Sequence, residues 1–307
     1  MKQSNYNYFT AKHAKHAKRQ NMYWQTPIKV AIMGGYGTFH EIAARHYFNS
    51  AAVDVEIITS ESFDEMFRLM KQGVAQHAIS AIENSVAGSI LPNYQLIHDS
   101  GLRITGEIYL RVCQHLAALP GQTIEDIHEV YSHPMAILQS KPFFDKHPRI
   151  KLIDGRDTAS CMRNISINGL KGVGAIGSRL AAGKYNLEIL SENIETNKRN
   201  YTRFLIMTDP EHLPSNPETP NKASISFALS HKIGSLAKVL SIFSYFDINL
   251  SKIQSLPIIG KEWEYLFYVD LEFTDMNMYR QSLVSVAPFI SDLCQMGFYR
   301  KGEVILE

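Results

Sequence analysis

The spacing of apolar residues along positions 28–207 switches repeatedly between two patterns. In one pattern they recur every three or four positions, as Met66, Phe67 and Met70 do before Gly73, and this spacing predicts amphipathic helices. The other pattern is a short apolar run, which predicts a strand. The predicted strands cover residues 28–33, 53–58, 77–82, 129–133, 150–153, 173–176, 187–190 and 202–207. Strands that alternate with helices favour an α/β fold.

The pattern stops at residues 210–221, which contain four prolines and few apolar groups. Such a segment is typical of a linker, so a domain boundary is predicted there. From 222 to 307 the order strand, helix, strand, strand, helix, strand predicts a ferredoxin-like βαββαβ unit, with the last strand near 298–306. The chain is therefore divided into a tail (1–26), an α/β region (27–209), the linker and the βαββαβ unit.

Composition and length agree with this division. The chain has 307 residues, 45% of them hydrophobic and 20% charged, which suits two globular domains. No apolar run approaches the roughly 18 residues of a membrane-spanning helix, so no membrane association is expected. Cys113, Cys161 and Cys294 are far apart and odd in number, which favours reduced thiols in a cytoplasmic protein over a disulfide or zinc framework.

The first 21 residues hold five Lys or Arg and no acidic residue. They lack the apolar stretch of a secretory signal, so we expect a disordered basic tail over 1–26 and no export. The alternative is that His13 and His16 bind a metal or that the basic run contacts nucleic acid. Met22 stands just before the first predicted strand, so we hypothesise that it is the native start; an intact mass of native protein that begins at Met1 would rule this out.

Small polar residues stand at the points where predicted strands give way to helices. Gly34, Gly35 and Gly37 precede Thr38, and glycines beside a helix N-terminus suit a carboxylate or a phosphate. A tight turn capped by Thr38 is the alternative. The spacing matches neither of the Gly-rich nucleotide-binding motifs.

Two further strand ends carry Glu83, Asn84 and Ser85 and, later, Ser132 and His133 before Pro134. Open α/β sheets bind ligands at such strand ends, and proline favours the first position of a helix. Helix capping by Asn84 or Ser85 and a structural His133 are the alternatives. Similar helix starts are predicted at Thr158 and Ser178. Neither ligand-spaced His and Glu clusters nor a nucleophile elbow occurs, which disfavours metal-dependent and acyl-enzyme chemistry.

Taken in order, the segments GYGTFHEIAA, IENSVAGSI, SHPMAILQ, DTASC, AIGSRLAA and NYTRF resemble those of prephenate dehydratase. GSLAKVL and KIQSLP, followed by WEYLFYVDLEF, resemble the ACT regulatory domain of that family. The resemblance covers roughly residues 28–301. It implies a bilobal catalytic domain of the type II periplasmic-binding-protein fold, with the site in the cleft between the lobes, and no cofactor or metal.

The resemblance also assigns roles to single residues. The Thr-Arg-Phe motif of the family falls on residues 202–204, which makes Thr202 the catalytic residue. The implied substrate-binding residues are Thr38, Phe39, Glu83, Asn84, Ser85, Gly88, Ser132, His133, Thr158, Asn200, Arg203 and Phe204. The implied effector-binding residues are Gly234, Ser235, Leu236, Asn249, Gln254, Ser255, Leu256 and Pro257. On a strand, Thr202 and Phe204 share one face and Arg203 the other.

Five positions depart from the family's usual residues. In the catalytic region, His40 stands where a serine is common and Ala81 where a proline often precedes Ile-Glu-Asn-Ser. Neither removes a catalytic group. In the effector region, Ser235 stands where alanine is common, Gln254 where glutamate is common and Leu256 where arginine is usual. Leu256 removes a charged, multidentate side chain, so we expect weaker coupling between effector and active site.

The resemblance implies a lyase that converts prephenate to phenylpyruvate in L-phenylalanine biosynthesis, with L-phenylalanine as inhibitor. It also implies a homodimer or a dimer of dimers, and no nucleic-acid partner. Arogenate dehydratase, with an amine in place of the substrate's ketone, is one alternative. A non-catalytic amino-acid sensor built on a binding-protein cleft is another. A solute receptor is disfavoured by the C-terminal module.

Overall fold

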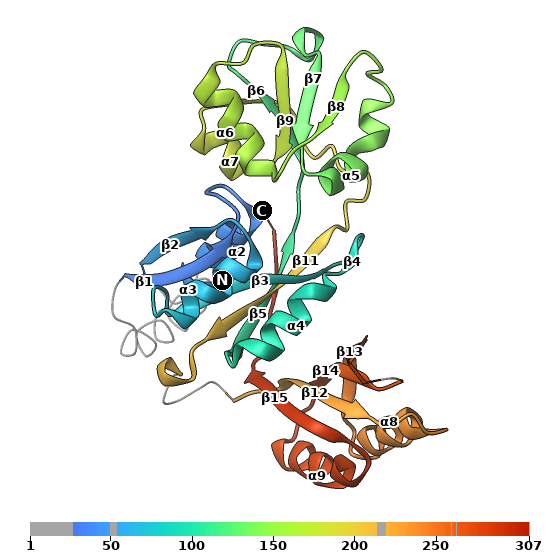
Figure 1. Ribbon diagram of the computed structural model, residues 1–307. Helices are drawn as coiled ribbons and strands as arrows, with labels where there is room; N and C mark the ends of the chain where they lie inside the picture. The colour runs from blue at the N-terminus through green and yellow to red at the C-terminus, as the bar shows by residue number, and fades with distance from the viewer. Residues whose placement is uncertain (1–26, 50–53, 214–218, 259, 262, 307) are drawn as a thin grey trace, which may run out of the picture. The chain divides into compact units, whose positions relative to one another are not determined.

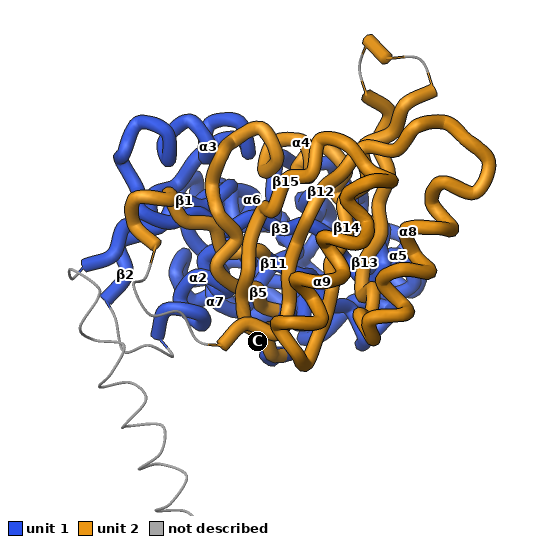
Figure 2. The backbone as a smooth tube through the Cα atoms, turned by 90° about the horizontal axis from the view of Figure 1, so that it is seen from below, with its two compact units in different colours: residues 1–88, 109–204, 304–307 blue, residues 89–108, 205–303 orange. Residues whose placement is uncertain are grey.

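The computed structural model describes residues 27–49, 54–213, 219–258, 260–261 and 263–306 (Figure 1). The predictions about the basic tail, including metal or nucleic-acid binding there, lie outside these residues. The described chain forms two compact units, coloured separately in Figure 2. The first unit comprises residues up to Gly88, Tyr109–Phe204 and the end of the chain from Val304; the second comprises Ser89–Ile108 and Leu205–Glu303. The domain limits read from the sequence stay a prediction.

The first unit contains two lobes, each built around a sheet. In the first lobe, strand order is β11-β3-β1-β2, and β1 pairs in parallel with β2 and β3. Its strands are β1 (Ile28–Met33), β2 (Val55–Ser60), β3 (His77–Asn84) and the first half of β11 (Tyr201–Thr208). Its helices are α2 (Phe39–Asn49) and α3 (Phe63–Lys71). The helix predicted from periodicity is confirmed, because α3 buries Met66, Phe67 and Met70.

The second lobe is a five-stranded sheet with helices on both faces (Figure 1). Strand order is β10-β6-β9-β7-β8, from β6 (His115–Ala118), β7 (Glu129–Ser132), β8 (Lys151–Asp154), β9 (Val173–Gly177) and β10 (Glu188–Ser191). Leu116 and Ile176 face the core under α5 (Pro134–Phe144). Their neighbours Ala117 and Ala175 face the core under α6 (Thr158–Asn168) and α7 (Arg179–Lys184). Because successive side chains of a strand point to opposite sides, β6 and β9 contribute apolar residues to the cores on both faces of the sheet.

The second unit contains the predicted βαββαβ element, which is confirmed. It runs β12 (Lys222–Leu229), α8 (Ser235–Tyr245), β13 (Asn249–Pro257), β14 (Tyr265–Glu272), α9 (Met276–Val286) and β15 (Ser291–Tyr299). The sheet order is β13-β14-β12-β15, with antiparallel pairs throughout. The last strand was predicted too late, near 298–306; it lies seven residues earlier, and only Val304–Ile305 form the short strand β16.

Helix α4 (Leu91–Ser100) and the first half of β5 (Arg103–Arg111) also belong to the second unit. Ile225 and Val269 belong to the core under α8 and α9, so their strand neighbours Ser226 and Tyr268 face the other side of the sheet. There the His98 Nδ1 atom lies 3.0 Å from Ser226 Oγ, and the Tyr268 hydroxyl donates to Gln95 Oε1 at 3.3 Å. Helix α4 therefore covers the second face of the βαββαβ sheet.

Within the described residues, no helix is long and apolar enough to cross a membrane. The three cysteines are free thiols, with Cys113 and Cys161 buried. Burial raises the pKa of the Cys161 thiol to about 11, so this residue is a neutral core thiol at neutral pH.

Candidate active site

The side chain of Asn84, at the end of β3, holds the Thr202 hydroxyl. Its Nδ2 group donates to Thr202 Oγ1 at 2.9 Å and to Asn200 Oδ1 at 2.6 Å. Its Oδ1 atom accepts from the backbone N–H groups of Val86 and Ala87 at 2.9 and 2.8 Å. Four hydrogen bonds therefore fix this amide. Because Thr202 Oγ1 is an acceptor in this arrangement, its own proton is left to donate elsewhere.

The same chain of amides continues into the second lobe. Asn200, which is buried, donates from Nδ2 to Gln139 Oε1 at 3.0 Å. Gln139 lies on α5, and its backbone carbonyl accepts from both the N–H and the hydroxyl of Thr196. Gln139 was not among the predicted site residues, although it ends the segment SHPMAILQ. Its place at the end of a segment that resembles the family was the available signal.

Ser85 and Gly88 shape the loop that follows β3. The Ser85 hydroxyl donates to the Arg199 carbonyl and accepts from the Tyr201 N–H, both at 2.9 Å. Gly88 has φ +84°, a left-handed conformation that favours glycine. Neither Asn84 nor Ser85 caps the next helix, because α4 begins at Leu91 with Ile90 as its N-cap. That alternative reading of the sequence is wrong.

The side chain of Arg203 is buried and pairs with Glu83, whereas the side chains of Thr202 and Phe204 lie on the opposite face of β11. Its exposed fraction is 2%, its Nη1 atom lies 3.5 Å from Glu83 Oε1, and its guanidinium lies 5.9 Å from the centroid of the Tyr109 ring. Phe204 instead contacts the ring of His40 edge-on, with 5.0 Å between centroids. Arg203 therefore neutralises Glu83.

The glycine turn before α2 is held by the side chain of Glu41, which is buried. The carboxylate accepts from the Gly37 N–H at 2.6 Å, so this N–H is not available to an anion. Thr38 donates its hydroxyl to the Gly35 carbonyl at 3.0 Å and thereby closes the turn. Phe39, the first residue of α2, is half-buried. The alternative of a tight turn closed by Thr38 describes this segment better than a free anion-binding loop.

In the second lobe, the predicted polar residues divide into structural and accessible groups. Ser132 is fully buried and donates to the Ile176 carbonyl at 2.9 Å. His133 is exposed and caps α5, because its Nδ1 atom accepts from the Met135 N–H at 3.1 Å. The neutral ring then carries its proton on Nε2, where it can donate to an anion. Thr158 is the first residue of α6, but the cap is Asp157, which accepts from the Ser160 N–H.

The two lobes of the first unit touch at the glycine turn. Ser178 Oγ donates to the Gly37 carbonyl at 2.6 Å, and the Tyr185 hydroxyl donates to the Tyr36 carbonyl at 2.9 Å. Gly37 has φ +88°, and a Cβ atom on it would lie 2.8 Å from Ala181. Only glycine fits here without displacing α7.

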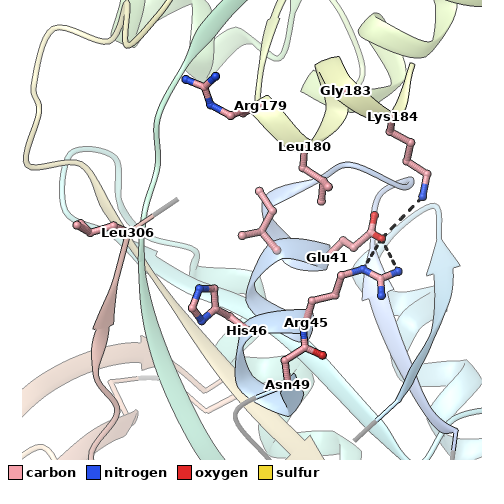
Figure 3. A pocket seen from close by; sticks show the side chains of 10 residues that line it. Glu41, Arg45, His46, Asn49, Arg179, Leu180, Gly183, Lys184 and Leu306 are labelled. Carbon is pink, nitrogen blue, oxygen red and sulfur yellow. Dashed lines mark hydrogen bonds and ion pairs between the residues drawn. The ribbon is translucent and has the colours of Figure 1, made fainter. Parts of the chain in front are cut away.

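A separate hollow of about 980 Å³ lies beside this contact and holds none of the predicted site residues (Figure 3). Arg45, at 2.8 Å, and Lys184, at 3.9 Å, both pair with Glu41. Arg179 pairs with Glu192 at 2.8 Å. The charges of Arg45, Lys184 and Arg179 that line the hollow are thus paired with carboxylates. Among the described residues, no group of three or more His, Cys, Asp or Glu side chains is arranged to hold a metal.

The predicted effector residues of the second unit lie at the start of α8 and along β13. Gly234 is the N-cap of α8 with φ +77°, followed by Ser235 and Leu236. Asn249 begins β13, and Pro257 ends it. Along this strand Gln254 and Leu256 alternate with Ser255 and Pro257, so these four side chains face both sides of the sheet.

Comparison with known proteins places this geometry in a family. The sequence pattern described as prephenate dehydratase matches residues 30–212. Arogenate dehydratase/prephenate dehydratase 1 of Arabidopsis thaliana is 36% identical over 259 residues, which cover 80% of this chain and 64% of that protein. The chain thus spans less than two thirds of that relative's length.

Solved structures show the same fold. The prephenate dehydratase of Arthrobacter aurescens in complex with L-Phe has a TM-score of 0.77 and 24% identity, covering 89% of this chain and 90% of that chain. GqqA, described as a novel type of quorum quenching acylase, has a TM-score of 0.79 and 26% identity, covering 89% of this chain and 98% of that chain. The predicted fold class is confirmed by these likenesses. With more than half of its length matched by the family pattern, the chain belongs to the prephenate dehydratase family.

Proposed function

We propose that this protein converts prephenate to phenylpyruvate, with Thr202 as the catalytic residue. The observation that carries the proposal is the hydrogen bond from Asn84 Nδ2 to Thr202 Oγ1. Because Thr202 Oγ1 accepts this bond, its own proton remains available to donate. A hydroxyl held in this way is a preorganised donor for an oxygen on which negative charge develops.

The reaction asks for positioning rather than for a strong acid or nucleophile. Prephenate is a dianion that loses one carboxylate as CO2 and the ring hydroxyl as hydroxide, and the ring becomes aromatic. Thr202 donates a hydrogen bond to the departing oxygen, which leaves as hydroxide and then takes a proton from solvent to become water. His133 Nε2–H, at the exposed N-terminus of α5, suits a substrate carboxylate, and the helix N-terminus adds a favourable field. Thr158, at the start of α6, is proposed to act in the same way.

Prephenate is favoured over arogenate by the pairing of Glu83 with Arg203. Arogenate carries an ammonium group, whose recognition requires an acidic or carbonyl partner. Glu83 is the acidic residue directly before Asn84 on β3, and its charge is already balanced by Arg203. The second candidate, arogenate dehydration, would need another carboxylate.

The test is to offer the purified chain each substrate separately and to follow phenylpyruvate and phenylalanine by absorbance and chromatography. We expect phenylpyruvate from prephenate and little phenylalanine from arogenate. A clear preference for arogenate would overturn the substrate assignment. Turnover of neither would leave the amino-acid sensor as the better description.

We also propose that L-phenylalanine inhibits the enzyme through the second unit and that the protein forms a homodimer, or a dimer of dimers, through this unit. The βαββαβ fold and the Gly234 N-cap, whose helix N–H groups suit an effector carboxylate, support the proposal. So does the contact of Lys252 on β13 with Ser89, where Nζ donates to Oγ at 2.7 Å. Ser89 directly follows Gly88 of the loop after β3, so we propose that movement of β13 is transmitted to this loop.

Titration of L-phenylalanine against prephenate turnover tests this route. Lys252→Met should weaken inhibition, whereas Lys238→Met on the exposed surface of α8 should not. Equal inhibition of the two variants would contradict transmission through Lys252. Equilibrium sedimentation tests the dimer, and a monomer at micromolar concentration would contradict it.

A further inference from the structure

His40 and Ala81, the two departures from the family's usual residues in the catalytic region, meet in one hydrogen bond. His40 Nε2 accepts from the backbone N–H of Ala81 at 3.2 Å. His40 lies in the first turn of α2, and Ala81 lies on β3. The contact is buried, because the exposed fractions of the two residues are 7% and 5%.

The chemistry of the replaced residues explains why the two departures belong together. A proline at position 81 has no N–H group and could not donate to His40. A serine at position 40 is shorter than histidine by several bonds and would not reach the β3 backbone in place of the ring. Either departure alone removes this hydrogen bond from a buried site, which is costly. Together, the two departures supply the donor and the acceptor of the hydrogen bond between the Ala81 N–H and His40 Nε2.

The pair also touches the strand that carries the candidate catalytic residue. The ring of His40 packs edge-on against Phe204, with 5.0 Å between centroids and an interplanar angle of 84°. Phe204 and Thr202 lie on the same face of β11, two residues apart. Ala81 lies three residues before Asn84 on β3. His40 thus contacts both strands whose ends supply the Asn84–Thr202 hydrogen bond.

We propose that His40 and Ala81 form a compensating pair that positions Asn84 against Thr202, an inference that rests on the proposed dehydratase function. His40 is a positioning residue and acts through β3 and β11. Its place beside the glycine turn also ties α2 to these strands.

The surroundings of His40 keep its ring in the form that the contact needs. Phe63 of α3 and Phe204 of β11 face the ring, and the Ala81 N–H faces Nε2. Burial lowers the pKa of His40 to about 4. The ring is therefore neutral at neutral pH, with Nε2 as acceptor and the proton on Nδ1.

A double-mutant cycle tests the pairing and its role. His40→Ser and Ala81→Pro are each expected to lower kcat about tenfold with little change in KM, because displacement of catalytic groups by about 1 Å can cost about a hundredfold. The double variant H40S/A81P is expected to recover kcat to within about threefold of the unmodified chain. His40→Gln, whose Oε1 can accept from Ala81, should also keep most of its activity. His46→Ser, at an exposed position of the same helix, is the matched control.

Each outcome decides a separate claim. Single effects that simply multiply in the double variant would overturn the pairing. A folded His40→Ser variant with unchanged kcat would overturn the positioning role. If the single variants fail to fold, nitrogen NMR of His40 in the unmodified chain still decides the pairing: a neutral ring protonated on Nδ1 supports it, and protonation on Nε2 refutes it. If the unmodified chain is inactive on both prephenate and arogenate, the proposed function and the positioning role are overturned. The melting temperatures of the unmodified chain, His40→Ser, Ala81→Pro and H40S/A81P still measure the pairing in that case.

Discussion

Replacement of Asn84 by aspartate is expected to disable the Thr202 hydroxyl while changing the shape of the site very little. The new side chain keeps the two hydrogen bonds that Asn84 Oδ1 accepts from Val86 and Ala87. In the unmodified chain, Asn84 Nδ2 lies 2.9 Å from Thr202 Oγ1 and 2.6 Å from Asn200 Oδ1 and donates to both. In the variant, a carboxylate oxygen takes the place of this donor. The Thr202 hydroxyl would then donate to this carboxylate instead of to the substrate.

The size of the effect follows from the hydrogen bond that must be broken. A hydrogen bond to a charged group contributes about 1.5–3 kcal/mol. Because each 1.4 kcal/mol changes a rate about tenfold, freeing Thr202 from the carboxylate costs about ten- to a hundredfold in kcat. The added negative charge also repels the dianionic substrate and raises KM. Asn84→Ala leaves Thr202 free to donate, so its kcat should fall less than that of Asn84→Asp.

The assay is steady-state production of phenylpyruvate from prephenate by the two Asn84 variants. Asn168→Asp, an amide-to-acid change at the exposed end of α6, controls for the added charge and should retain normal kcat. Circular dichroism and thermal unfolding show whether each variant is folded. A folded Asn84→Asp variant whose kcat is within about twofold of that of the unmodified chain would refute the prediction. So would a kcat that is no lower than those of Asn84→Ala and the control.

Two further predictions concern stability. The pKa of His40 is lowered from 6.5 to about 4 in the folded chain. The neutral ring therefore contributes to the free energy of unfolding fully above pH 6.5, and this contribution is lost as the pH falls toward 4. From His40, urea unfolding should show a loss of about 2 kcal/mol between pH 7 and pH 5. In H40S/A81P the loss should be smaller by this amount, while the lowered pKa of His115, caused first by burial, contributes in both proteins. Gly37→Ala should lower stability by more than about 1 kcal/mol, because its φ is +88° and the new methyl meets Ala181. Gly35→Ala, with no atom within 4 Å, is its control, and equal melting temperatures would contradict the steric argument.

Local patterns in the sequence were sufficient for much of the fold. Helix α3 was predicted because Met66, Phe67 and Met70 repeat at helical spacing. Strands β5 and β6 were missed, and β5 shows why. Its Glu107 is buried against Lys222, with Nζ 2.9 Å from Oε1 and a partner 115 residues away. In the sequence, a charged residue that will be buried in an ion pair cannot be distinguished from an exposed one. Glu107 therefore interrupts the apolar pattern by which β5 would have been predicted.

The site shows the same limit. The Thr-Arg-Phe segment identified Thr202, and the order of segments brought Asn84 and Asn200 into the predicted site. The bond between Asn84 and Thr202 joins residues 118 positions apart and has no local signature. Gln139 was missed because its role depends on where α5 lies relative to Asn200. His40 and Ala81 read as two unrelated departures, since only the fold shows that one donates to the other.

The central claim, that a threonine hydroxyl held by Asn84 performs the dehydration, is tested most directly by kcat of the Thr202→Ala variant on prephenate. Loss of one preorganised donor costs about a hundredfold or more in kcat. The account therefore predicts a folded variant whose kcat is at least about a hundredfold below that of the unmodified chain. A folded Thr202→Ala variant that produces phenylpyruvate at a near-normal rate would contradict it.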